Sequence, residues 1–167
     1  KALQSAVPAT STNQKLRKAL VYYLEHPHTH VSFDDAVRNF PLGFINRKSK
    51  GVPYSFWELL EHIRLTQRDI IDFLEKPDYK EVEWPKDYWP KPGAKATKKM
   101  WDKTIRGFRK DFLALKKIVK NPKNDLLRLT PVRGSQIFRG ALQIMEHTSY
   151  HLGEFVLMRR AMGIWKR

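Results

Sequence analysis

"SFWELLEHIRLTQRDIIDFLEKP", residues 55–77, carries the pattern that decides the fold class. Ser55 and Glu58 have the spacing of a capping box, in which two side chains satisfy backbone N–H groups that a helix start leaves unpaired. The apolar residues that follow recur every three or four positions, and Pro77 closes the run because proline cannot continue a helix. The segment therefore predicts one long amphipathic helix with a defined start and end.

Three further segments repeat this amphipathic period. Their expected bounds are residues 11–26 ahead of Pro27, residues 97–120, and a span that begins after Pro131 or Gly134 and ends near Met162. Ser11 and Gln14 make a second plausible capping box, at the start of the first of these helices. The chain thus predicts four long helices that each need a partner for an apolar stripe.

The links between the helices are irregular. Residues 32–40 read as a short helical piece, residues 41–53 as a loop, and residues 77–93 contain four prolines and no helical period. We expect an all-α fold, a four-helix bundle with a Pro-rich crossover between its second and third long helices. We expect residues 1–10 to be a disordered N-terminal segment and residues 11–167 to form one domain.

The net charge of +15 raises the question of a nucleic-acid partner. Thirteen lysines and arginines lie between Lys86 and Lys123, interleaved with an apolar stripe over residues 101–119. They are therefore expected to form the solvated face of a helix whose aromatic residues are buried and cannot stack on bases. This argues against nucleic acid, and a basic binding module stays as the alternative, with strongly salt-dependent affinity as its mark.

The composition also limits which kinds of site and which classes of protein are possible. The absence of cysteine excludes disulfides, thiolate metal ligands and a cysteine nucleophile. No apolar run approaches the length of a membrane span. We expect a cytoplasmic protein, and because the chain begins at Lys1 rather than methionine, a removed signal peptide stays open.

His147 and His151 lie four residues apart in the last helix, so their imidazoles share one face and can bind one ion. His62 is expected to point into the bundle from the second long helix. Three histidines from two helices would leave a metal coordination position open for water or substrate. From the residues alone, a three-histidine metal site and histidines satisfied within the core are both open.

Two further features bear on such a site. Glu154 follows His151 by three residues on the same face, and is a further ligand, a group that orients a histidine, a base, or a carboxylate at the rim of the bundle. Asp69 is interpreted as structural. His26, His28 and His30 have alternate spacing and are interpreted as a polar turn rather than a chelating loop.

Two longer stretches resemble the DinB superfamily of DinB/YfiT-like metalloenzymes. "GVPYSFWELLEHIRLTQRDIIDFL" (51–74) is similar to the segment of that family in which a proline-containing loop leads into W-x-L-L-x-H. "MEHTSYHLGEFVLMRRAMGIW" (145–165) resembles its C-terminal H-x-x-x-H-x-G signature, and "PDYKEVEWPKDYWP" (77–90) resembles the crossover of one branch. The stretch "HTSY" departs from the H-N-A-Y that is frequent in relatives.

The resemblance implies a four-helix bundle with a divalent metal ion on His62, His147 and His151. It also implies a metal-dependent enzyme, a transferase or hydrolase that in some members uses a low-molecular-weight thiol. All-nitrogen ligation suits Zn, Ni or Fe(II), and Glu154 is the candidate catalytic residue. The substrate is an unidentified small molecule and a homodimer is expected, while a structural dimerising bundle without metal is the remaining alternative.

Overall fold

Helices account for the regular structure of the computed structural model, which describes residues 9–26, 29–129 and 136–165, with side chains from residue 12 onward. Within these ranges there are five α-helices and one 3-10 helix, and no strand. The helices are α1 (Ala9–Glu25), α2 (Phe33–Val37), η1 (Leu42–Phe44), α3 (Phe56–Glu75), α4 (Lys98–Lys120) and α5 (Ile137–Ala161). The all-helical class is confirmed. The number of α-helices is five rather than four, because the short piece after Ser32 forms a separate helix, α2.

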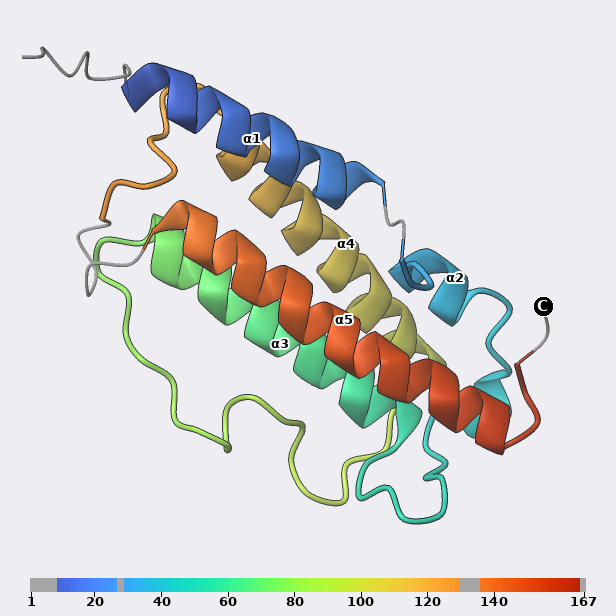
Figure 1. Cartoon of the computed structure of the whole chain (residues 1–167). Coiled ribbons are helices and arrows are strands. Elements are labelled where there is room, and N and C mark those ends of the chain that lie inside the picture. Colours follow the sequence, from blue (N-terminus) through green and yellow to red (C-terminus); the bar gives the residue numbers. More distant parts are fainter. Residues whose placement is uncertain (1–8, 27–28, 130–135, 166–167) are drawn as a thin grey trace, which may run out of the picture.

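The long helices lie side by side as a bundle (Figure 1). Helix α3 packs against both α4 and α5, α1 packs on α4, and α2 packs on α5. Helices α3 and α5 therefore share a long interface, and this interface carries the three predicted histidines.

The start of α3 is the one that the sequence predicts. The Ser55 hydroxyl accepts from the Glu58 backbone N–H, and the Glu58 carboxylate accepts from the Ser55 N–H at 2.7 Å. Helix α4 begins after Thr97, whose side chain accepts from the Met100 N–H, and it ends at Lys120 as predicted. Polar residues with oxygen acceptors thus set both starts.

Other boundaries differ from the prediction. Helix α1 begins at Ala9, so Ser11 lies inside its first turn and is not the cap. Of the predicted disordered segment, residues 1–10, the first eight residues lie outside the described part of the chain. Helix α2 ends at Val37 rather than at Phe40. Helix α5 begins after Gln136, whose side chain makes no capping hydrogen bond. A periodic pattern constrains the ends of a helix least, because without a strong cap the helix can begin or end one or two residues to either side.

Two apolar clusters fill the bundle. One joins α2, η1, the start of α3, the first half of α4 and the end of α5, and the other joins α1, the end of α3, the second half of α4 and the start of α5. The basic residues predicted for the solvated face of α4 are exposed, apart from Lys116, which is half-buried. His62 lies in the first half of α3, next to Ile63 of the first cluster.

A buried arginine ties the end of α5 to α2. The Arg159 guanidinium donates to the carbonyls of Ala36, at 2.6 Å, and Ile164, at 3.0 Å. It also lies over the ring of Trp165, 4.8 Å from the centroid. These contacts tie the C-terminal end of α5 to α2, although the buried Nε of Arg159 has no hydrogen-bond partner among the described residues.

The crossover between α3 and α4 is held to α3 by one carboxylate. Asp69 accepts hydrogen bonds from the hydroxyls of Tyr79, at 2.7 Å, and Tyr88, at 2.6 Å. Burial raises the pKa of Tyr79 to about 12, with the hydrogen bond to Asp69 adding to the effect. The structural role predicted for Asp69 is confirmed. Among the described residues, no helix combines the length and apolar character that crossing a bilayer requires.

Candidate metal centre

The three predicted histidines come together between α3 and α5. His62 Nε2 lies 3.1 Å from His147 Nε2 and 3.2 Å from His151 Nε2. One ring nitrogen from each histidine falls within 4.8 Å of the other two. His62 is buried, with 2% of its surface exposed, and the other two are half-buried. Among the described residues, this is the group of His, Cys, Asp and Glu side chains whose spacing fits a metal ion.

The spacing matches a shared ion. Zinc–nitrogen bonds of about 2.0–2.1 Å at tetrahedral angles place two ligand nitrogens about 3.3–3.4 Å apart, and octahedral angles bring them to about 3 Å. The two measured separations lie between these values. The three histidines can therefore hold one divalent ion, and three ligands leave a coordination position open.

The orientation of His62 is set from the crossover. Its Nδ1 lies 2.7 Å from the Tyr88 carbonyl oxygen, which can only accept, so Nδ1 carries the proton. The indole of Trp89 stacks on the same imidazole, with centroids 3.9 Å apart and planes 3° from parallel. Tyr88 is itself anchored through its hydroxyl to Asp69. The crossover therefore presents the Nε2 lone pair of His62 to the space between the helices.

The orientation of His151 is set from its own helix. Its Nδ1 lies 2.6 Å from Glu154 Oε2, and the same carboxylate accepts a hydrogen bond from the Tyr54 hydroxyl. Burial, followed by this hydrogen bond and the carboxylate charge, raises the pKa of Tyr54. An ionised carboxylate on Nδ1 keeps the proton there and leaves Nε2 as the lone-pair nitrogen.

These contacts bear on the alternatives for Glu154. The carboxylate lies behind His151, on the ring nitrogen that faces away from the other two histidines. An ion bound to Nε2 would be about 6 Å from Oε2, given an N–metal bond of about 2 Å, so this oxygen cannot ligate the same ion. The geometry favours the orienting role, and a role for Glu154 in catalysis stays a prediction.

Neutral imidazoles alone do not satisfy the cluster. With both Nδ1 atoms protonated, the facing Nε2 atoms of His62 and His151 are both acceptors, 3.2 Å apart. His147 can donate a single proton, to one of them. Buried acceptors without donors are costly, whereas a cation between the three nitrogens satisfies every lone pair at once.

Burial also keeps the cluster in its ligating form. It lowers the pKa of His62, although the hydrogen bond to the Tyr88 carbonyl acts in the opposite sense. Burial, with the nearby His151 and His62, lowers the pKa of His147 to about 3. Both imidazoles are therefore neutral at pH 7, which is the state that binds a metal ion.

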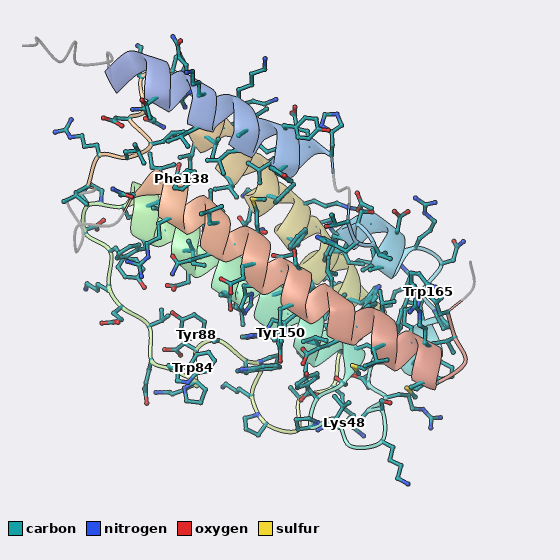
Figure 2. All side chains as sticks on the ribbon, viewed as in Figure 1. Lys48, Trp84, Tyr88, Phe138, Tyr150 and Trp165 are labelled. Carbon is teal, nitrogen blue, oxygen red and sulfur yellow. The ribbon has the colours of Figure 1, made fainter. Side chains whose placement is uncertain are left out.

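The sequence pattern did not reveal the partners of His62. The Tyr88 carbonyl and Trp89 come from the crossover, which has no helical period, and no role was predicted for either residue. Its one signal is a high density of aromatic residues in the segment "YKEVEWPKDYW", residues 79–89. Trp84 and Tyr88 both project from this segment on the α3 and α5 side of the bundle (Figure 2).

The second group of histidines does not form a metal site in the described part of the chain. His26 and His30 are exposed, and His28 lies outside the described residues. His26 Nδ1 bonds the Tyr22 carbonyl at 3.2 Å, and His30 Nδ1 bonds the Val31 carbonyl at 2.9 Å. These local contacts agree with the predicted polar turn.

Comparisons with protein-family models, with curated proteins and with solved structures found no match for this chain.

Proposed function

We propose that this protein is a metalloenzyme of the DinB-like type, in which His62, His147 and His151 bind one divalent ion. The observation that carries the proposal is the convergence of three Nε2 atoms, two of them fixed as acceptors, at 3.1 and 3.2 Å. The resemblance of residues 51–74 and 145–165 to the DinB superfamily supports it independently, since it rests on sequence motifs rather than on geometry.

The proposed reaction class is transfer or hydrolysis on a small molecule, with water or a low-molecular-weight thiol as nucleophile. A divalent ion in the site lowers the pKa of the water or thiol beside it and so supplies a nucleophile near neutral pH. The all-nitrogen ligand set suits Zn, Ni or Fe(II).

Other residues of the chain orient the metal ligands. The Tyr88 carbonyl and the Trp89 ring hold His62, and the Glu154 carboxylate holds His151, so that both rings present Nε2. Loss of such a partner of a metal ligand typically costs about 10- to 100-fold in metal affinity or activity. Glu154 also has a proton-handling role in this proposal, because it links His151 to the Tyr54 hydroxyl.

The test is elemental analysis of the protein purified without a chelating tag, before and after incubation with Zn, Ni or Fe(II). We expect about one ion per chain in the wild type. His62→Ala and His147→Ala should each lose stoichiometric metal, because each removes one of three ligands. His26→Ala is the matched control and should keep the metal, since His26 lies at the exposed end of α1.

Wild-type protein that takes up none of the three metals would refute the proposal. Equal metal content in the two ligand variants and the wild type would do the same. Circular dichroism on each variant separates metal loss from unfolding.

A further inference from the structure

A cavity of about 650 Å³ opens where α1 ends and α2 begins, against α4 and α5. It lies on a different side of α5 from the histidine cluster, because its lining uses Ile144, Met145, Thr148, Ser149 and Leu152. Its volume falls within the range of ligand pockets, about 300–1,000 Å³. The cavity is therefore separate from the metal centre and needs its own explanation.

The cavity follows from the interruption between two helices. Helices α1 and α2 follow one another along the same side of the bundle (Figure 1). Helix α1 ends at Glu25, and α2 begins only at Phe33. The described residues of this junction, 26 and 29–32, are not helical, and the cavity opens beside them against α4 and α5.

The floor of the cavity is apolar. It is made of buried side chains from four helices, Leu24, Phe33, Phe108, Ile144 and Leu152, each at most 8% exposed. Phe33 and Phe108 stack there, with centroids 3.8 Å apart and planes 13° from parallel. An apolar ligand body would remove this surface from water, which is the main favourable term for such binding.

Two carboxylates, Glu25 and Asp34, and two cations, Arg109 and Lys116, lie at the rim, and the ion-pair partner of Glu25 comes from outside the lining. Asp34 is paired with Arg109 at 2.7 Å, and Glu25 is paired with Lys120. Lys116 also lines the cavity, and its ammonium lies 5.0 Å from the centroid of the Phe112 ring. Because both lining carboxylates have a cation partner, Lys116 is the charge placed to receive an anionic group.

Part of the cavity wall is polar. Ser149 Oγ lies 3.0 Å from His30 Nε2 and 2.7 Å from the Met145 carbonyl oxygen, to which it donates. Its side chain and that of Thr148 both line the cavity. Few polar groups around a mainly apolar cavity are typical of small-molecule sites, in which they fix the orientation of the ligand.

We propose that this cavity binds a small amphipathic carboxylate, with its apolar body on the phenylalanine floor and its head group at Lys116. The site does not depend on the metal centre, and its ligand need not be the substrate of the proposed reaction.

The test compares three ten-carbon probes by isothermal titration calorimetry: decanoate, 1-decanol and decyltrimethylammonium. We expect decanoate to bind with a Kd below about 1 mM. The neutral and cationic probes should bind about 2- to 5-fold more weakly, as expected for one partly exposed ion pair. Decanoate that shows no binding, or that binds no better than decyltrimethylammonium, would overturn the proposal.

Two pairs of variants locate the site. Met145→Trp should weaken decanoate at least about tenfold by occupying the cavity, and Leu142→Trp, on the same helix but outside the lining, should not. Lys116→Glu should remove the preference for decanoate over decanol, and Lys117→Glu, with the same change in net charge, should keep it. Equal effects within either pair would overturn the assignment, and zinc content reports that each variant is folded around an intact metal centre.

Discussion

Glu154 offers the sharpest test of how the metal centre works. The carboxylate accepts from His151 Nδ1 at 2.6 Å, and hydrogen bonds to charged groups contribute about 1.5–3 kcal/mol net. Its side chain keeps 30% of its surface exposed, which lowers the contribution toward the bottom of that range. We therefore expect Glu154→Ala to weaken zinc binding by about 10- to 30-fold.

Glu154→Gln should have a smaller effect. The amide oxygen can still accept from His151 Nδ1, but the charge that strengthens the bond is gone. We expect a loss of about three- to tenfold in affinity. Competition against a chromophoric zinc chelator at constant pH measures both variants on one scale.

The mechanism predicts that Glu154 acts through His151. In a His151→Ala background, Glu154→Ala should therefore cause no further loss of zinc affinity, which a double-mutant cycle measures directly. If Glu154→Ala leaves the affinity of the wild-type background unchanged, or costs the same in both backgrounds, the orienting role is wrong.

Two more predictions concern stability. In metal-free protein, the folded state holds His62 and His147 below their ordinary pKa of 6.5, so the unfolded chain binds more protons once the pH falls below 6.5. The free energy of unfolding should then fall from pH 7 to pH 5, with His147 contributing less than about 1 kcal/mol per pH unit after allowance for partial exposure and His62 acting in the same direction; urea unfolding in a chelator checks this, and a flat or rising profile contradicts it. Gly140→Val should destabilise the protein by about 1–3 kcal/mol, because a Cβ there would lie 2.7 Å from Leu74 Cδ1. Gly153→Ala, which meets nothing within 4 Å, should stabilise it by up to about 1 kcal/mol; thermal unfolding that ranks the two variants the other way would refute the packing argument.

The sequence by itself determined the helices and much of the site. Local periodicity placed α3, α4 and the body of α5, and the side chains of Ser55 and Thr97 set two helix starts. The four-residue spacing of His147 and His151 placed both rings on one face, because that spacing is close to one helical turn. At the start of α5, where Gln136 makes no capping hydrogen bond, and at the start of α1, the predicted boundaries were off by a few residues or lay outside the described part of the chain.

Only the tertiary structure decided which histidine meets which. The alignment of His62 with α5 depends on how α3 and α5 pack along their whole length, and periodicity within one helix carries no information about that register. The partners of His62 come from a crossover without regular structure, held in place by Asp69 through tyrosine hydroxyls. The cavity beside α5 likewise results from where α1 ends and α2 begins against α4 and α5. Contacts between segments far apart in the chain create both sites, whereas the sequence pattern reports on neighbours a few residues away.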